Sequence, residues 1–172
     1  MTFFKNKFRI ESIRLKGYDY SSPGEYFITI CTLDKQCVLG DVVDKEMQLN
    51  EIGKIVAQCW EEIPNHFPNV ELDAFVAMPN HVHGIIIIND RGRDVQLNVS
   101  TRLSPKRGSL SVIVRTFKAA VTTICRRQGY HEFGWQSRFY EHIIRSEKEL
   151  NIIRDYIVNN PAAWLQDDEL PK

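Results

Sequence analysis

Hydrophobic and polar positions along the chain follow two periods, one typical of strands and one typical of helices, and the two interleave. Residues 25–32 (EYFITICT) are rich in aromatic and β-branched side chains and predict a strand. Residues 37–43 (CVLGDVV) follow a turn at Asp34 and predict its hairpin partner. The first structural unit is therefore expected to be a pair of antiparallel strands.

A second hairpin is predicted in the middle of the chain. Apolar residues occupy every second position of residues 70–78 (VELDAFVAM). A strand over this segment would have one face formed by Val70, Leu72, Ala74, Val76 and Met78. A Pro-Asn turn then leads into a strand over residues 81–88 (HVHGIIII).

Two helices have recognisable ends. One follows Asn50, a good N-cap residue, and its apolar spacing stops at Pro64. The other opens at Ser146, with Glu149 three residues later as in a capping box, and ends near Pro161.

A third helix is predicted over residues 110–127, with an apolar stripe on one side and basic residues on the other. Residues 135–144 (WQSRFYEHII) predict one more strand before the last helix. The order strand, strand, helix, strand, strand, helix, strand, helix predicts a single α+β domain over residues 1–172. Its expected core is a ferredoxin-like, RNA-recognition-motif-like antiparallel sheet with helices packed on it.

Composition fits one ordinary domain, since 172 residues carry 43% hydrophobic and 26% charged side chains. No apolar run approaches the roughly 20 residues of a membrane helix, and the N-terminus has no signal-peptide core. We expect a cytoplasmic, nucleoid-associated protein without a membrane partner. The four cysteines form no CxxC pair, which favours reduced, mostly packed thiols.

Charge is segregated along the chain although the net charge is zero. Residues 1–16 carry five Lys or Arg against one acid, and residues 91–128 carry nine against one Asp. Residues 89–109 are polar and basic without periodicity, which predicts a mobile basic loop. Two basic segments in a neutral protein are typical of a localised phosphate-binding surface, although an ordinary solvated surface has the same composition.

Two histidines begin the strand at 81–88. Residues two apart on a strand share a face, so His81 and His83 lie on one side about 7 Å apart along the strand. They could converge on one metal ion or one phosphate. The alternative is a half-buried pair bonded to the backbone at a strand end.

A tyrosine on the last helix offers a second reactive group. Tyr156 and Asn160 are four residues apart and share one side of a helix, while Ile153 and Ile157 flank the tyrosine on the packed face. The alternative is a tyrosine with its hydroxyl at the rim of the core and an ordinary helix stop at Asn-Pro.

Together, the motifs MPNHVH and YIVNNP resemble the HUH single-tyrosine transposases, and most closely the REP-associated tyrosine transposase branch. The segments RLKGYDYSSPGEYFITICT and WQSRFYEHIIRSEKEL extend the resemblance over most of the chain, in the order of that family. It implies that His81 and His83 bind a metal ion, with Val82 as the bulky middle residue, and that Tyr156 is the nucleophile. It also implies that Asn160 is the third polar metal position, where related transposases often carry Gln.

The activity implied is nicking and rejoining of DNA through a 5′-phosphotyrosine and a free 3′-hydroxyl, with no ATP. A free phenol has a pKa near ~10, so the nucleophile needs help from a cation or a base. A divalent Mg²⁺ or Mn²⁺ ion would suit the ligands and the phosphate. Single-stranded or hairpin DNA is the expected partner, and the expected DNA contacts are Arg14, Lys106, Arg107, Arg115, Lys118 and Arg126.

Several alternatives stay open. Tyr140 is a rival nucleophile, but its neighbour four residues on, Ile144, cannot bind a metal. Glu141 and His142 could support the site from behind, or could simply pack. The protein could instead be a non-catalytic single-stranded nucleic-acid-binding module, or a metal-dependent phosphoesterase that activates water. The sequence does not decide between monomer and homodimer, or between a tyrosine acting in cis or in trans.

Overall fold

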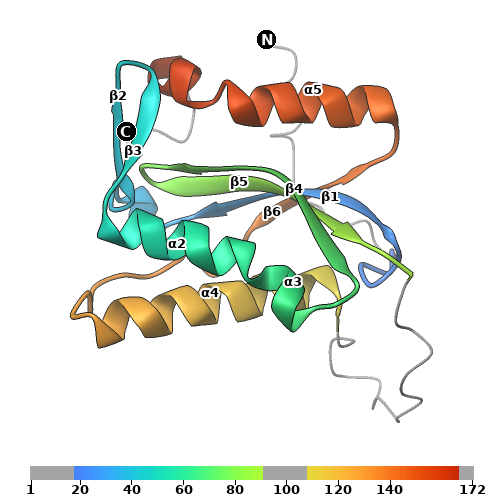
Figure 1. The fold of residues 1–172 in the computed structure, drawn as a ribbon, viewed down its shortest axis with the longest axis horizontal. Helices are drawn as coiled ribbons and strands as arrows, with labels where there is room; N and C mark the ends of the chain where they lie inside the picture. Colours follow the sequence, from blue (N-terminus) through green and yellow to red (C-terminus); the bar gives the residue numbers. More distant parts are fainter. Residues whose placement is uncertain (1–17, 91–107, 167–172) are drawn as a thin grey trace.

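A four-stranded antiparallel sheet in the order β4-β5-β1-β6 forms the centre of the structure (Figure 1). This computed structural model describes residues 18–90 and 108–166. The strands are β1 (Gly24–Cys31), β4 (Val70–Met78), β5 (His81–Ile88) and β6 (Tyr140–Ile144). The two central strands, β1 and β5, therefore come from distant parts of the chain.

Helices cover both faces of this sheet (Figure 1). On one face lie α2 (Glu51–Glu61), the short α3 (Ile63–His66) and α4 (Leu110–Arg127). On the other lies α5 (Glu147–Val158), which continues into a 3-10 helix over Pro161–Gln166. The predicted α+β fold, an antiparallel sheet with helices packed on it, is confirmed. In the part of the chain that the structure describes, no helix has the length and apolar character needed to cross a membrane.

The sheet separates two hydrophobic cores. Successive residues of β1 point alternately into each, because side chains on a strand change face at every residue. Ile28 and Ile30 lie in the larger core beneath α2 and α4. Phe27 lies in the smaller core beneath α5, with Ile153 and Ile157 of that helix.

The predicted helix starts are present. The Asn50 side chain accepts a hydrogen bond from the Gly53 backbone N–H at 3.0 Å, and Ser146 Oγ accepts one from the Glu149 N–H at 3.2 Å. The Glu149 carboxylate in turn accepts from the backbone N–H of Arg145 at 2.9 Å, one residue before the position that a capping box predicts. These bonds satisfy backbone donors that a helix leaves without internal partners.

The predicted first hairpin is wrong. β1 pairs with β5 and β6, while β2 (Gly40–Val43) pairs with β3 (Glu46–Leu49) in a separate two-stranded sheet. Asp44 and Lys45 form the tight turn between them, with positive φ angles of 51° and 67°. Such two-residue turns usually contain Asn or Gly, so Asp-Lys gave no turn signal and β3 was not predicted.

The predicted last strand begins too early, because β6 starts at Tyr140 rather than at Trp135. Trp135 forms only an isolated bridge with Thr32. The helix α5 ends at Val158, so Asn160 lies just beyond it and not on its last turn.

A β-bulge interrupts β4. Leu72 pairs with Ile86 but Phe75 pairs with Gly84, so β4 contains one residue more than β5 between these two pairs. An extra residue of this kind changes the face to which the following side chains point.

The bulge corrects the predicted alternation of Val70–Met78. After it, Ala74 and Val76 pack on the α5 side, whereas Phe75 enters the larger core. There the Phe75 ring stacks on Trp60, with ring centroids 4.7 Å apart and an interplanar angle of 18°. Burial of the larger aromatic ring in the larger core explains why the simple alternation fails.

Candidate active site

Two buried imidazoles meet on the α5 side of β5. His81 and His83 are 0% and 3% exposed, and their Nε2 atoms are 3.0 Å apart. The predicted shared face is therefore present, and both rings direct the same nitrogen to one point.

The other ring nitrogens are held by neighbouring side chains. Nδ1 of His81 lies 2.7 Å from Asn80 Oδ1, and Nδ1 of His83 lies 2.8 Å from Thr29 Oγ1. A carbonyl oxygen only accepts, so the His81 proton is on Nδ1 and its Nε2 presents a lone pair. Metal-binding histidines are usually oriented in this way by a partner on the second nitrogen.

Electrostatics keeps His81 neutral. Burial, with a smaller contribution from the Lys35 charge, lowers its pKa to about 3. The imidazole is therefore in the unprotonated form that binds metal ions at neutral pH.

The α5 helix brings Tyr156 to this pair. Its hydroxyl oxygen lies 3.2 Å from His83 Nε2, and the two ring centroids are 5.2 Å apart. The Phe27 ring packs edge-on against the tyrosine at 6.1 Å. Ile153 and Ile157 of the same helix are buried below, as the helical spacing predicts.

Asn160 lies close beyond Tyr156 in a buried position, 2% exposed. Its side-chain oxygen is buried and has no hydrogen-bond partner among the described residues. Four residues before it Tyr156 contacts His83, and four residues after it the Trp164 ring lies 6.1 Å from the His81 ring. A buried acceptor without a partner costs about 1–3 kcal/mol, so a side-chain oxygen left in this state between Tyr156 and Trp164, two residues that reach the histidine pair, fits a ligand position.

These groups fit a divalent cation. Adjacent ligands of an octahedral ion at about 2.1 Å are about 3 Å apart, which matches the separation of the two Nε2 atoms, 3.0 Å. Two imidazoles with an amide oxygen suit Mn²⁺ or Mg²⁺. Within residues 18–90 and 108–166 there is no group of three His, Cys, Asp or Glu side chains that could hold a metal. A third protein ligand at this point would therefore come from another residue type, and the Asn160 amide oxygen is a candidate.

The rival nucleophile Tyr140 lies on the same face but farther away. It pairs with Thr29 across the sheet, and Thr29 pairs with His83, so β1 separates the two. Burial, with a smaller contribution from Glu141, raises the pKa of Tyr140 and disfavours its phenolate. Of the two phenols, Tyr156 has the contact with the histidine pair.

Glu141 and His142, the two groups expected to support the site, lie on opposite faces of the sheet. Glu141 pairs with Ile28, whose side chain lies in the core beneath α2 and α4, so the structure does not bring Glu141 to the histidines. His142 pairs with Phe27 on the α5 side, and its Nε2 lies 2.9 Å from the Glu149 carboxylate. This contact joins β6 to the first turn of α5.

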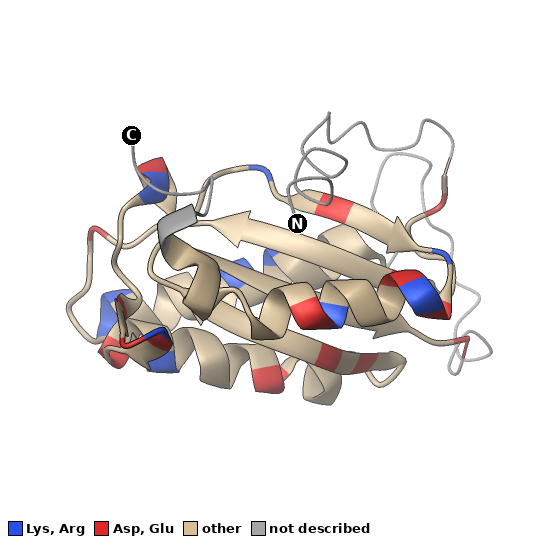
Figure 2. Ribbon diagram, turned by 90° about the horizontal axis from the view of Figure 1, so that it is seen from above, with Lys and Arg blue, Asp and Glu red and all other residues tan. Residues whose placement is uncertain are grey.

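The expected DNA contacts on α4 lie on the other layer of the protein. Arg115 and Arg126 are exposed there, and the sheet lies between them and Tyr156. The Lys118 ammonium donates to the carbonyls of Gln136 and Arg138, at 2.7 and 3.2 Å. Arg14, Lys106 and Arg107 lie outside the described residues. Along the described part of the α5 layer, positions of Lys and Arg lie next to positions of Asp and Glu (Figure 2).

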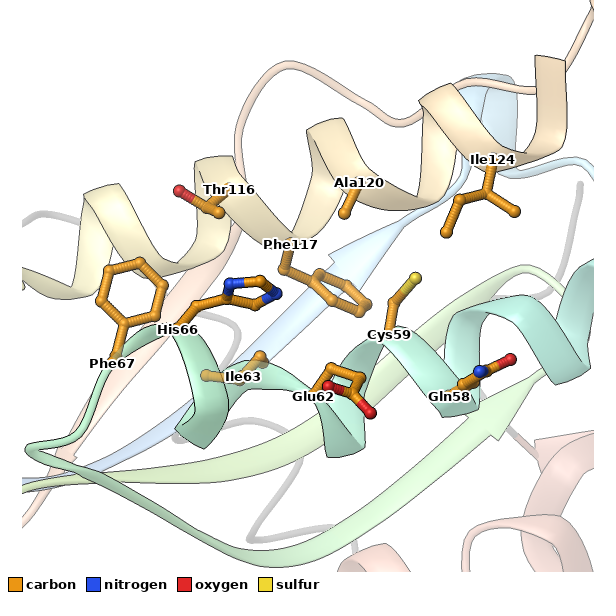
Figure 3. Close-up of a pocket in the computed structure, with 10 residues that line it drawn as sticks. All are labelled: Gln58, Cys59, Glu62, Ile63, His66, Phe67, Thr116, Phe117, Ala120 and Ile124. Atoms are coloured by element: carbon orange, nitrogen blue, oxygen red, sulfur yellow. The ribbon is translucent and has the colours of Figure 1, made fainter. Parts of the chain in front are cut away.

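A shallow pocket opens on the α4 layer as well. Apolar side chains of α2, α3 and α4 form most of its wall, with Glu62 and His66 exposed at its edge (Figure 3). It lies on the opposite side of the sheet from the histidine pair and takes no part in the site described above.

Two residues that orient the imidazoles, Thr29 and Asn80, were not among the predicted site residues. Asn80 directly precedes the first histidine, so its position in the motif was a usable signal. Thr29 was not recognisable, because the pairing of β1 with β5 joins residues 54 positions apart.

Comparisons with known proteins identify two curated relatives, both from Haemophilus influenzae (strain Rd). One, described only as an uncharacterized protein, is 47% identical over 162 residues, which cover 91% of this chain and 90% of the relative. The other, named "Putative REP-associated tyrosine transposase", is 30% identical over 146 residues, which cover 84% of this chain and 73% of the relative. No family model matches the chain.

A solved structure has the same fold. It is described as a REP-associated tyrosine transposase bound to a REP hairpin, and it superposes with a TM-score of 0.57 at 22% identity. The match covers 83% of this chain and 68% of that chain. It supports the arrangement of sheet and helices described above.

Proposed function

Because the chain belongs to the REP-associated tyrosine transposase family, we propose that it nicks and rejoins single-stranded or hairpin DNA with Tyr156 as the nucleophile. The contact between the Tyr156 hydroxyl and His83 Nε2, 3.2 Å, is the observation that carries the proposal. The solved relative with the same fold was captured on a REP hairpin, which supports hairpin DNA as the substrate class.

The proposed step is a transesterification. The Tyr156 oxygen attacks the scissile phosphorus, the phenol loses its proton, and a tyrosyl O–P bond forms as the bond from phosphorus to the 3′-oxygen breaks. The 3′-oxygen takes up a proton and leaves as a hydroxyl. Attack by that hydroxyl on the 5′-phosphotyrosine reverses the step and joins the strands, so no ATP is consumed.

His81, His83 and Asn160 would hold a divalent Mg²⁺ or Mn²⁺ ion, which when bound would offset charge on the phosphate oxygens. The surrounding residues orient the imidazoles and the phenol. Asn80 and Thr29 keep both imidazoles facing one point, while the Phe27 ring supports the phenol and the His83 ring, at 6.1 and 5.4 Å between centroids.

We further propose that the tyrosine acts in cis, with a monomer sufficient for the reaction. Both the histidines and the phenol that contacts them come from one chain, which supports this arrangement. Mixing Tyr156→Phe protein with His83→Ala protein tests it. Neither variant should recover activity in the mixture, whereas recovery would show that one chain supplies the tyrosine to another.

DNA binding outside the site is proposed for the basic residues predicted from the sequence. Arg115 and Arg126 are exposed on α4, on the opposite side of the sheet from Tyr156. A DNA strand that contacts these arginines and also reaches Tyr156 must therefore pass an edge of the sheet. Loss of one phosphate contact should lower the slope of log affinity against log salt by about 0.7–0.9. Neutralising Arg14, Lys106 or Arg107 in turn identifies which of them contribute.

The deciding experiment is adduct formation. The full chain is incubated with DNA hairpins from its own genomic flanks and Mn²⁺ or Mg²⁺, then separated under denaturing conditions. We expect a covalent protein–DNA adduct that is absent in Tyr156→Phe, retained in Tyr140→Phe and lost with chelator. Tyr140→Phe is the matched control because it removes one phenol from the same face of the sheet.

The other outcomes point to a different nucleophile or to a different function. An adduct that survives in Tyr156→Phe but is lost in Tyr140→Phe would move the nucleophile to β6. Metal-dependent cleavage without any adduct would indicate a phosphoesterase that activates water. Binding that needs neither metal nor Tyr156 would indicate a nucleic-acid-binding module.

A further inference from the structure

The apolar contacts of α5 hold this helix on the sheet but set its rotation only loosely. Leu150, Ile153 and Ile157 insert into the smaller core, and hydrophobic burial has no directional preference. Tyr156 lies at one border of this buried stripe, so a small rotation of the helix would move its hydroxyl away from His83.

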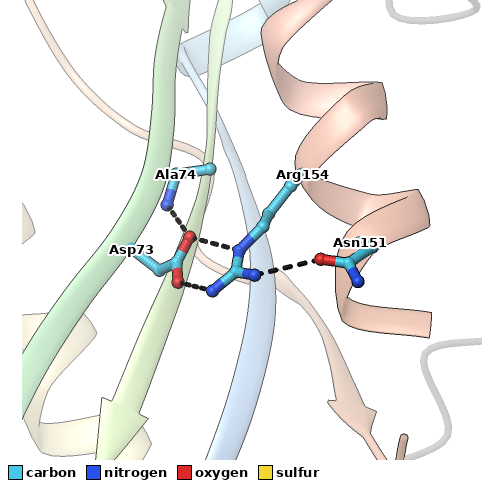
Figure 4. A network of polar contacts seen from close by, with 4 residues as sticks. All are labelled: Asp73, Ala74, Asn151 and Arg154. Atoms are coloured by element: carbon cyan, nitrogen blue, oxygen red, sulfur yellow. Dashed lines mark hydrogen bonds and ion pairs between the residues drawn. The ribbon is translucent and has the colours of Figure 1, made fainter. Parts of the chain in front are cut away.

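A polar anchor lies at the opposite border. Residues two apart on a helix are separated by roughly 160° around the axis, which places Arg154 and Tyr156 on either side of the stripe. Nε and Nη2 of Arg154 donate to the two carboxylate oxygens of Asp73, at 2.9 and 2.5 Å (Figure 4). Nη1 of the same guanidinium donates to Asn151 Oδ1 at 3.0 Å, one turn earlier on α5.

The position of Asp73 follows from the bulge in β4. Asp73 lies between the Leu72–Ile86 and Phe75–Gly84 pairs, where β4 has its extra residue. Its carboxylate also accepts from the Ala74 backbone N–H at 2.6 Å, a second contact that orients the carboxylate toward the arginine (Figure 4). Bulges frequently re-aim a side chain beside an active site.

The ion pair is too exposed to be a major source of stability. The side chains of Arg154 and Asp73 are 40% and 18% exposed. Pairs of this kind contribute little to folding, but a two-point contact between guanidinium and carboxylate defines direction well. Its geometry therefore suggests positioning rather than stabilisation.

We propose that the Asp73–Arg154 pair is a positioning device that sets the rotation of α5 and thereby holds the Tyr156 hydroxyl at His83. Arg154 and Asp73 are positioning residues, because their hydrogen bonds join α5 to β4 while the contact with His83 comes from Tyr156, and they therefore act through the helix. The functional part of this inference rests on the proposed nicking reaction; the structural part does not.

The test compares two charge-removing variants on the same helix. Arg154→Gln removes the anchor, and Lys148→Gln removes an exposed charge from the first turn of α5 as the matched control. In single-turnover assays we expect Arg154→Gln to slow adduct formation roughly 10- to 100-fold, because small misplacement of a reacting group has effects of this size. DNA affinity should change less than about twofold, and the melting temperature by no more than about 4 °C.

A second measurement reads the position of the phenol without DNA. A 3-fluorotyrosine is placed at position 156 of the full chain, and its ¹⁹F resonance is recorded in the wild-type, His83→Ala, Arg154→Gln and Lys148→Gln backgrounds. Arg154→Gln should move the resonance toward its position in His83→Ala, while Lys148→Gln should leave it unchanged. Arg154→Lys, which keeps the charge but not the fork, should resemble Arg154→Gln.

The outcomes separate the two proposals. An unchanged ¹⁹F resonance in Arg154→Gln, or full recovery of the rate in Arg154→Lys, would overturn the positioning role. If the wild-type protein forms no adduct on any hairpin, the proposed function fails, and the ¹⁹F comparison still decides whether Asp73 and Arg154 position the helix.

Discussion

The hydroxyl of Tyr156 lies 3.2 Å from Nε2 of His83, although the two residues are 73 positions apart in the chain. One lies on a central strand and the other on the helix that covers it, so the contact exists only once the sheet and α5 have assembled. The Thr29 hydroxyl lies at hydrogen-bond distance from the other ring nitrogen of His83. The orientation of this imidazole therefore depends on a residue outside the site.

Replacing Thr29 with Val tests this dependence. The change removes the hydroxyl that lies 2.8 Å from His83 Nδ1 and keeps the shape of the side chain. We expect affinity for Mn²⁺ to fall about 10- to 100-fold, as for other partners of metal-binding histidines. Calorimetric titration of the folded protein with Mn²⁺ measures it.

Thr122→Val is the matched control for that variant. The Thr122 hydroxyl donates to the Lys118 carbonyl on α4, on the other side of the sheet, so Mn²⁺ affinity should not change. Equal affinity in the wild type and Thr29→Val would mean that Thr29 does not orient a metal ligand.

The sequence was sufficient for the features that depend on local pattern. The stripe along α4 and the cap at Asn50 were read correctly, because helix spacing and capping depend on residues three or four apart. The shared face of His81 and His83 follows from the period of a strand. The helical spacing likewise placed Tyr156 at the edge of the buried stripe.

Features that depend on distant partners were not readable. The pattern of β4 fits both a regular and a bulged strand, and the structure has the bulged one, in which Phe75 stacks on Trp60. The placement of α4 on the layer opposite Tyr156 is a property of the whole sheet, so its arginines were grouped with the site by charge alone. The Asp73–Arg154 pair joins residues 81 positions apart and left no local signal.

Gly84 allows the Trp60 ring to lie directly against β5. A Cβ atom at this position would overlap that ring, and both are buried. We therefore expect Gly84→Ala to destabilise the protein by about 1–3 kcal/mol, the usual cost of overpacking, in urea unfolding experiments. Gly24→Ala in the same sheet is the control, because its Cβ would meet only ordinary contacts at 3.5 Å or more. Equal stability of the two variants would contradict the claim that the Trp60 ring requires glycine at position 84.

Lys118 is expected to stabilise the segment that leads into β6. Its half-buried ammonium donates to the Gln136 and Arg138 carbonyls, and burial lowers its pKa. Lys118→Gln should lower the free energy of unfolding by about 1–3 kcal/mol, the usual range for hydrogen bonds from a charged group. Arg126→Gln, an exposed change on the same helix, should stay within about 0.5 kcal/mol. A Lys118→Gln protein as stable as Arg126→Gln, but with weaker DNA binding, would instead make Lys118 a phosphate contact.

His81 should make the folded protein sensitive to mild acid. Burial lowers its pKa to about 3 in the folded state, while the unfolded chain has the ordinary value near ~6.5. Between these values the unfolded state binds the extra proton, so the stability that His81 contributes is complete above about pH 6.5 and is lost as pH falls toward 3. The slope for one proton is at most about 1.4 kcal/mol per pH unit.

The urea midpoint of wild-type protein, measured in metal-free buffer, should therefore fall between pH 7 and pH 5 by more than that of His81→Gln, which has no imidazole to protonate. The difference between the two proteins isolates His81 from the other titrating groups. His66→Gln is the control, since it also removes a histidine, but one that is exposed on α3. Parallel pH profiles for the wild type and His81→Gln would show that the pKa of His81 is the same in the folded and unfolded protein, and its lowering by burial would then be wrong.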